Sequence, residues 1–168
     1  LITLLLQNFN LSTKQVLGET LQLKLLWKVK VGRFIWRITW SPDGKKLAIT
    51  MENGSVMLYD FKGNKLWSIN TIGQVRGVDF SPDGTMLAIG SGYLNIVYST
   101  NGNLIASYKF PSGSVTAISW ASQGNKIFVS THGPVRLLVF EINDGKLRIS
   151  EEITPPTILD HESLPICD

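Results

Sequence analysis

One short pattern occurs three times at a spacing of 40 residues, and it constrains the fold of this chain more than any other feature. The copies read Trp-Ser-Pro-Asp-Gly at 40–44, Phe-Ser-Pro-Asp-Gly at 80–84 and Trp-Ala-Ser-Gln-Gly at 120–124. Apolar residues flank each copy at matching distances, as at Ile38, Val78 and Ile118. Self-similarity at a fixed period of this size indicates a repeat protein.

Within one copy the apolar periodicity is that of short strands. Val75–Phe80 and Met86–Ile89 are predicted as first and second strands, and Val56–Tyr59 and Lys65–Ile69 as third and fourth. In the Ser-Pro-Asp-Gly turn, Ser caps the turn, Pro fixes φ, and Gly supplies the left-handed residue. Asn53-Gly54 is predicted as a two-residue hairpin turn. One copy is therefore a small antiparallel meander of four strands.

A four-stranded sheet of this size cannot bury a face alone, so the copies must stack face to face. The architecture that stacks such sheets at this period is the β-propeller. The predicted fold is all-β, a partial β-propeller of about three and a half four-stranded antiparallel blades. Trp40, Phe80 and Trp120, which end the first strands, are expected to pack between blades; stacking on a ligand is the alternative.

The pattern Val-x-x-Val-x-Phe-Ser-Pro-Asp-Gly-x-x-Leu-Ala at Val75–Ala88 resembles a WD40 repeat, and the resemblance extends over residues 21–150. Two family features are altered. The Trp-Asp pair that ends the third strand is replaced by Tyr59-Asp60, Tyr98-Ser99 and Phe140-Glu141, and the Gly-His pair before the first strand is missing. The family's buried His–Asp network therefore cannot form, and blade stability is expected to rest on apolar packing. The blade at 39–68 is also similar to blades of intraflagellar-transport propellers.

Three whole blades are predicted over 34–72, 73–112 and 113–150, with part of a preceding blade over 1–33 and a linker or tail over 151–168. Leu21 to Val31 alternate apolar with mostly polar residues and are predicted as the fourth strand of the preceding blade, with Thr3–Phe9 as a candidate third strand. Propellers typically have about 4–8 blades. We therefore expect the ring to be completed by further blades of a longer chain or by another subunit.

The composition offers little material for chemistry. Hydrophobic residues make up 43% and charged residues 17%, which is typical of a folded domain. The lone Cys167 excludes an internal disulfide, and two histidines, His132 and His161, leave few metal ligands. No apolar run approaches the roughly 20 residues of a membrane span. No catalytic residue, cofactor or metal is predicted, the chain is predicted not to be an enzyme, and an intracellular, cytoplasmic location is expected.

The resemblance implies that one face of the disc binds protein partners, through the loops before each first strand and the turns between second and third strands. The positions on that face are Trp36, Arg76, Thr116, Asn53, Tyr93 and His132. Trp, Arg and Tyr are enriched among interface hot spots. Inter-blade packing remains the alternative for Trp36, and an exposed turn position the alternative for His132.

Basic residues concentrate in the first half of the chain. Residues 1–75 carry ten Lys or Arg against four Asp or Glu, and residues 76–168 carry six against nine. Five of the cations form a basic stripe at Lys24, Lys28, Lys30, Arg33 and Arg37. The stripe is either a solvated edge strand that discourages pairing or a contact for an acidic protein, phosphorylated peptide, nucleic acid or anionic lipid.

The function predicted from these features is a non-catalytic protein–protein interaction scaffold, a WD40-like propeller segment. Two alternatives remain. One is a sensory or regulatory propeller attached to an enzyme or signalling domain outside this segment. The other is a propeller that binds an anionic ligand or nucleic acid through the basic stripe, although the basic residues are not interleaved with a recognisable nucleic-acid-binding module.

Overall fold

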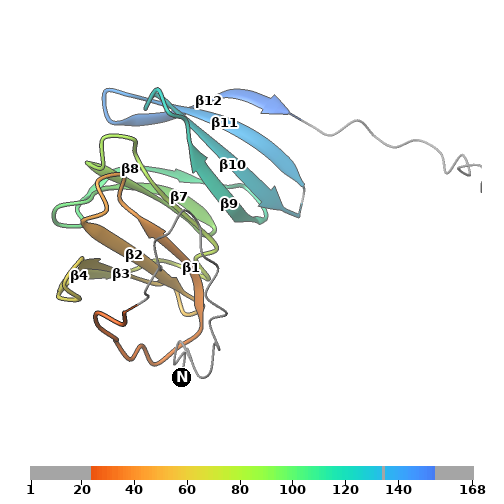
Figure 1. Cartoon of the computed structure of the whole chain (residues 1–168). Coiled ribbons are helices and arrows are strands. Elements are labelled where there is room, and N and C mark those ends of the chain that lie inside the picture. Colours follow the sequence, from red (N-terminus) through yellow and green to blue (C-terminus); the bar gives the residue numbers. More distant parts are fainter. Residues whose placement is uncertain (1–23, 134, 154–168) are drawn as a thin grey trace, which may run out of the picture.

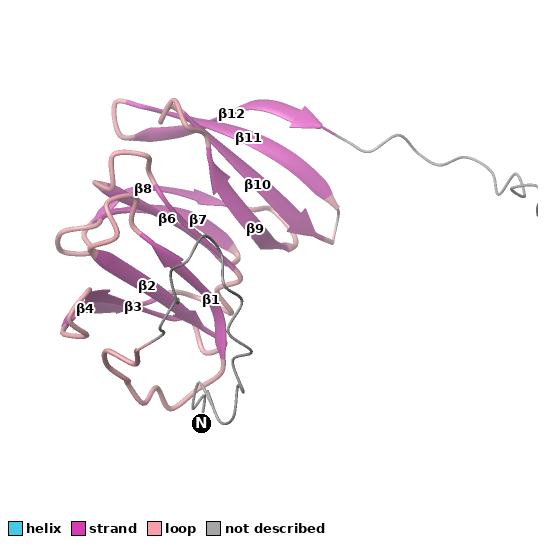
Figure 2. Ribbon diagram, in the orientation of Figure 1, coloured by secondary structure: helices cyan, strands magenta, loops and turns pink. Residues whose placement is uncertain are grey.

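The structure, a computed structural model, describes residues 24–133 and 135–153, and this part of the chain consists of strands and turns without a helix (Figures 1 and 2). The strands form three antiparallel sheets, each a meander in chain order. Blade 1 comprises β1 (Ile35–Trp40), β2 (Lys46–Met51), β3 (Ser55–Asp60) and β4 (Lys65–Asn70). Blade 2 comprises β5 (Gly77–Phe80), β6 (Met86–Gly90), β7 (Tyr93–Tyr98) and β8 (Leu104–Lys109). Blade 3 comprises β9 (Ser114–Trp120), β10 (Lys126–His132), β11 (Arg136–Asn143) and β12 (Lys146–Ile153).

The three blades stack face to face, and their first strands lie next to one another (Figure 1). Apolar side chains fill the space between successive blades. Between blades 1 and 2, Leu58 and Val56 meet Phe80 and Leu87. Between blades 2 and 3, the core includes Leu94, Ile96, Trp120, Ile127 and Phe140. The predicted all-β fold of four-stranded antiparallel sheets is confirmed.

The aromatic residues that end the first strands differ in burial. Phe80 and Trp120 are buried between blades, as predicted, with exposed fractions of 4% and 7%. Trp40 is 49% exposed, so it is not packed between blades in the described part of the chain. The reason is its position on the face of β1 that points away from blade 2, where the described part of the chain provides no complete sheet to cover it.

The Ser-Pro-Asp-Gly turns form as predicted. The Ser81 hydroxyl donates to Asp83 Oδ1 at 2.6 Å and accepts from the Met86 amide at 2.9 Å, and Gly84 has a φ of 69°. Ser41, Asp43 and Gly44 repeat this arrangement in blade 1. The prediction of a two-residue turn at Asn53-Gly54 is wrong, because the loop spans 52–54 and only Gly54 has a positive φ, of 85°.

The strand register corrects the residue pair at the end of the third strand in blade 2. Lys46 lies opposite Asp60, and Met86 lies opposite Tyr98. The pair equivalent to Tyr59-Asp60 is therefore Val97-Tyr98 and not Tyr98-Ser99. The shift arises because the turn between β6 and β7 is shorter than the turn between β2 and β3. A constant 40-residue offset therefore holds for first and second strands and fails for third strands.

The predicted strand over 21–31 is not formed by its described residues, 24–31. Trp27 nevertheless packs on blade 1 as the fourth strand of a preceding blade would. Its indole nitrogen donates to the Phe61 carbonyl at 3.0 Å, just as the Trp67 indole donates to the Ser99 carbonyl of blade 2 at 3.1 Å. The candidate pairing strand, Thr3–Phe9, lies outside the described residues. Residues 154–168 of the predicted tail also lie outside them. At the other end, β12 continues to Ile153, past the boundary predicted at 150.

Gly90, the last residue of β6, tests how closely the blades pack. A Cβ atom at this position would overlap the Val115 side chain of blade 3, and Gly90 does not have a positive φ. We expect Gly90→Ala to lower the free energy of unfolding by about 1–3 kcal/mol, because overpacking forces the blades apart. Gly92→Ala is the matched control, since nothing lies within 4 Å of the added methyl group. Chemical denaturation measures both, and equal stabilities for the two variants would contradict the close approach.

Candidate functional site

The strand register gives each blade two distinct edges. Ile35 lies opposite Met51, and Ser55 lies opposite Asn70. The start of the first strand, the turn between second and third strands and the end of the fourth strand therefore share one edge, which we call the 2–3 edge. The Ser-Pro-Asp-Gly turns lie at the opposite edge, called the 1–2 edge. All six predicted partner-binding residues lie at or beside the 2–3 edge.

Trp36, Arg76 and Thr116 occupy equivalent positions where strand pairing is irregular. Trp36 is passed over between the pairs of Ile35 and Arg37, and Thr116 is likewise passed over in β9. In blade 2 the Arg76 amide donates to the Gly90 carbonyl, although Gly77 is the residue opposite Gly90. A bulge redirects a side chain out of the regular pleat and is common next to functional sites.

The structure brings Trp36 and Arg76 into contact across blades 1 and 2. The Arg76 guanidinium carbon lies 5.0 Å from the centroid of the Trp36 ring, within range of a cation–π interaction. Arg76 also donates to Gln74 Oε1 at 2.8 Å, and Arg37 Nε donates to the Arg76 carbonyl at 3.2 Å. Trp36 remains 42% exposed. Its ring contacts the neighbouring blade through Arg76 and still presents a large area to solvent.

The other predicted positions are spread along the same edge. Asn53 accepts from the Ser55 amide at 3.2 Å within its turn, and Thr116 shares a hydrogen bond of 2.8 Å with Ser130. Tyr93 begins β7, with the Lys109 ammonium 6.0 Å from its ring centroid. His132 ends β10 and is exposed. Tyr93 and His132 thus flank the turns in which they were predicted to lie.

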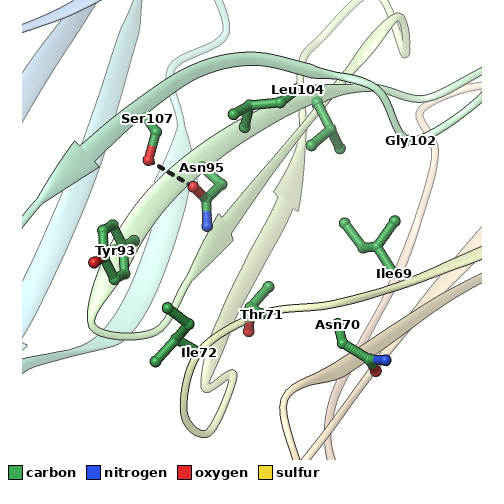
Figure 3. A pocket seen from close by; sticks show the side chains of 10 residues that line it. Ile69, Asn70, Thr71, Ile72, Tyr93, Asn95, Gly102, Leu104 and Ser107 are labelled. Atoms are coloured by element: carbon green, nitrogen blue, oxygen red, sulfur yellow. Dashed lines mark hydrogen bonds between the residues drawn. The ribbon is translucent and has the colours of Figure 1, made fainter.

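A groove of about 380 Å³ between blades 1 and 2 was not predicted from the sequence (Figure 3). β4 and the residues after it form one wall and β7 and β8 the other, with Ser107 donating to Asn95 Oδ1 at 2.7 Å. The groove exists because Ile69, Thr71 and Val97 are smaller than their counterparts in the next interface. There, Tyr108, Phe110 and Phe140 form an aromatic cluster with centroids 5.0–6.0 Å apart. The loss of these aromatic residues is the sequence signal for the groove.

Asp79, another residue that the sequence analysis did not single out, connects blades 2 and 3. Its Oδ2 accepts a hydrogen bond from the Trp120 amide at 2.7 Å, and its Oδ1 accepts from the Phe80 amide at 3.0 Å. Burial raises the pKa of Asp79 above its ordinary value, although both hydrogen bonds oppose the shift. Its geometry indicates a role in joining the blades.

The basic stripe is divided between two parts of the structure. Lys24, Lys28 and Lys30 are exposed on a segment whose other side, with Trp27, Val29 and Val31, is half-buried or buried. The burial of these three residues agrees with the predicted alternation, whereas Leu25, predicted on the same face, is 65% exposed, and no ladder forms. Arg33 is also exposed, whereas Arg37 belongs to β1 and reaches towards blade 2. Within the described ranges, the ion pairs join other side chains, such as Arg136 with Glu152 at 3.2 Å.

Residues 24–133 and 135–153 hold no group of three or more His, Cys, Asp or Glu side chains that could bind a metal ion. In the same ranges there is no helix that is long and apolar enough to cross a membrane.

Comparisons with known proteins agree with this geometry. The family model of the Anaphase-promoting complex subunit 4 WD40 domain matches residues 5–67 and 55–123. The chain therefore belongs to the WD40-repeat family of β-propellers, whose members are generally non-enzymatic scaffolds.

Among curated relatives, WD repeat-containing protein 35 of Rattus norvegicus is 26% identical over 132 residues, which is 73% of this chain and 11% of that protein. Human Echinoderm microtubule-associated protein-like 2 is 33% identical over 109 residues, which is 60% of this chain and 16% of that protein. The chain thus spans a small part of the relatives that it matches.

Solved structures show the same fold. The WD40 repeats of RRP9 superpose with a TM-score of 0.69 at 15% identity, over 76% of this chain and 40% of that chain. Chaetomium thermophilum Sqt1, bound to the N-terminus of the ribosomal protein L10, superposes with a TM-score of 0.63 at 20% identity, over 71% of this chain and 36% of that chain. The predicted partial propeller of WD40 type is confirmed.

The contact between Asp79 and Trp120 predicts that the free energy of unfolding depends on the side chain at position 79 and on pH. Asp79→Ala removes the acceptor and is expected to lower the free energy of unfolding by about 1–3 kcal/mol. Asp79→Asn keeps an acceptor oxygen and removes the charge, so it is expected to retain most of the stability at about pH 7.

Burial raises the pKa of Asp79 in the folded protein above its ordinary value of 3.8. The folded state therefore binds the proton more tightly than the unfolded state does, which stabilises the fold at pH values below 3.8. This stabilisation is lost as the pH rises through the raised pKa of the folded state. The unfolding free energy of the wild type relative to Asp79→Asn should therefore fall between about pH 3 and pH 7. Urea denaturation across this range measures it, and a difference that grows with pH would contradict the assignment.

Proposed function

We propose that this protein is a non-catalytic platform that binds protein partners along the 2–3 edge of its blades. The observation that carries the proposal is the exposed contact between Trp36 and Arg76 at two equivalent bulges. Tryptophan and arginine are the residue types most enriched in interface hot spots. Here the ring and the guanidinium are held by neighbouring blades, so little side-chain freedom remains to be lost on binding.

The scaffold supports this role because it fixes a wide surface with short turns. The turns at the 2–3 edge have two or three residues in blades 1 and 2, and the packed cores between the blades fix their relative positions. Two matched structures are described as complexes, namely Sqt1 with the N-terminus of a ribosomal protein and the Mitotic Checkpoint Complex. Those complexes are properties of those proteins, and the extension to this chain rests on its edge geometry.

A second set of partners follows from the two end blades. Phe128 of blade 3, at 37% exposure, takes the place of Ala48 and Ala88, each of which is covered by the next blade. On blade 1, Ile38 and Trp40 are 57% and 49% exposed. We propose that further blades, from the same longer chain or from another subunit, cover these faces, with residues 34–72, 73–112 and 113–153 as the repeating units. An intracellular location is part of this proposal.

The second candidate function is binding of an anionic ligand by the N-terminal part of the stripe. Its support is the shared exposure of Lys24, Lys28 and Lys30 without an ion pair among the described residues. Such binding would weaken steeply as salt is raised, whereas partner binding through Trp36 would be less sensitive to salt.

Substitution of aromatic residues on opposite edges tests the platform. Affinity purification of the full-length protein, with quantitative mass spectrometry, should recover partners whose binding falls about tenfold with Trp36→Ala, because a hot-spot truncation costs about 1–2 kcal/mol or more. Tyr93→Ala should weaken the same partners.

Phe61→Ala is the control for that experiment. Phe61 is an aromatic residue at 52% exposure in the turn after β3, on the 1–2 edge. Recovery of the partners should be unchanged in this variant. If Phe61→Ala removes them as strongly as Trp36→Ala does, or if neither substitution has an effect, the 2–3 edge is not the binding surface.

A further inference from the structure

The inner end of the 2–3 edge combines two guanidinium groups with an exposed indole. We propose that Trp36, Arg37 and Arg76 bind an acidic peptide segment of a partner protein, through its Asp or Glu carboxylates. This inference rests on the proposed function, because it concerns the same edge, and it adds the chemistry of the partner.

The two edges differ in their turn aspartates, whereas cations lie at both edges. The cations at the 1–2 edge are Lys45, Lys46, Lys62, Lys65, Lys126 and Lys146. The described aspartates in hairpin turns lie at the 1–2 edge, and they are Asp43, Asp60, Asp83 and Asp144. Arg37, Arg76 and Lys109 lie towards the 2–3 edge, where Glu52 is the acidic residue of the β2–β3 turn. Arg136 at this edge is already paired with Glu152. What distinguishes the inner end of the 2–3 edge is a pair of neighbouring arginines, Arg37 and Arg76, joined by the hydrogen bond from Arg37 Nε to the Arg76 carbonyl.

The two arginines are held in place by groups that leave their charge uncompensated. Arg37 uses Nε for the Arg76 carbonyl, so its two terminal nitrogens remain available. Arg76 stacks on Trp36 and uses one terminal nitrogen for Gln74. No carboxylate of the described residues lies within ion-pair distance of either guanidinium.

This arrangement suits carboxylates in particular. A guanidinium presents paired N–H donors that match the two oxygens of a carboxylate, and a fixed guanidinium loses less entropy when it binds. Arg37 and Arg76 come from adjacent blades, so they offer two separate positions for two acidic side chains. The exposed face of Trp36 beside them provides area for the apolar part of a peptide.

An acidic peptide fits better than a nucleic acid. A nucleic acid requires a continuous basic track along its phosphates. Here the track is interrupted, because Glu52 lies at the same edge and the lysines of the stripe lie on a separate segment. In blade 3 the position equivalent to Trp36 and Arg76 is neutral, and Thr116 pairs there with Ser130.

The experiment measures binding of a fluorescein-labelled hexaglutamate peptide to the full-length protein by fluorescence anisotropy. Hexaglutamine is the neutral comparison peptide. Arg37→Gln combined with Arg76→Gln is expected to weaken hexaglutamate binding at least about tenfold, since the double substitution removes both guanidinium partners of the peptide carboxylates. Arg76→Lys keeps the charge, loses the planar stacking group, and should give a smaller loss.

The matched control is Lys45→Gln combined with Lys62→Gln, which removes the same charge from the 1–2 edge. It should change hexaglutamate binding less than about twofold, because exposed charges beyond a Debye length are screened. Thermal unfolding of each variant verifies folding. If the double arginine variant does not fold, the single Arg76→Lys and Trp36→Phe variants carry the comparison.

Four outcomes overturn the inference. Equal weakening by the arginine and lysine pairs would show attraction by net charge alone. Equal binding of hexaglutamine would exclude carboxylate recognition. Binding of a phosphoserine peptide without binding of hexaglutamate would show a phosphopeptide site. If partners still depend on Trp36 and Tyr93 while the arginine variants bind hexaglutamate normally, the platform stands and the acidic-peptide inference falls.

Discussion

The structure depends on apolar packing between successive blades. Blade 2 buries both of its faces, and blades 1 and 3 each bury one face against it. Leu58 and Phe80 in one interface, and Leu94 and Trp120 in the next, contribute to the same kind of core. The hydrogen bonds within a sheet define a blade, but they do not stabilise it in isolation, because a single small sheet leaves its faces in water. The altered Trp-Asp and Gly-His positions are expected to exclude the family's polar network. Individual hydrogen bonds still join successive blades, as between the Trp120 amide and the Asp79 carboxylate.

The stacking of similar blades also explains which features of the fold can be predicted from the sequence. The 40-residue spacing, the Ser-Pro-Asp-Gly turns and the buried Phe80 and Trp120 are repeated in register, so the all-β propeller follows from them. Features that arise from small differences between the copies cannot be predicted from the repeated pattern. The shortened turn before β7 moves Tyr98 by one position, and the replacement of bulky aromatic residues by Ile69, Thr71 and Val97 opens a groove. To predict the Tyr98 register or the groove, turn lengths and side-chain volumes must be compared between copies. A constant 40-residue offset aligns the wrong residues for that comparison.

The sequence predicted the position of the candidate site but not its contacts. The repeat made Trp36, Arg76 and Thr116 equivalent, and the resemblance to WD40 repeats implied that they lie at one face of the disc. The stacking of Arg76 on Trp36 required the relative placement of blades 1 and 2, which no local pattern encodes. The same is true of Arg37, which the sequence grouped with Lys24, Lys28 and Lys30, whereas its hydrogen bond to the Arg76 carbonyl assigns it to the inner strands.

The charged side chains at the two edges of the blades have different hydrogen-bond partners. At the 1–2 edge, the Ser81 hydroxyl lowers the pKa of Asp83, and the side chain of Asn64 lowers that of Asp60, because these carboxylates accept hydrogen bonds within their own turns. Their charge is thereby committed to local structure. At the 2–3 edge, positive-φ glycines such as Gly54 and Gly113 close the connections without a charged cap. The backbone there accommodates bulges, and the arginine side chains are held by a carbonyl, an amide and an indole, which do not neutralise them. The turn aspartates at the 1–2 edge are thus engaged by their own turns, whereas Arg37 and Arg76 at the 2–3 edge have no carboxylate partner among the described residues.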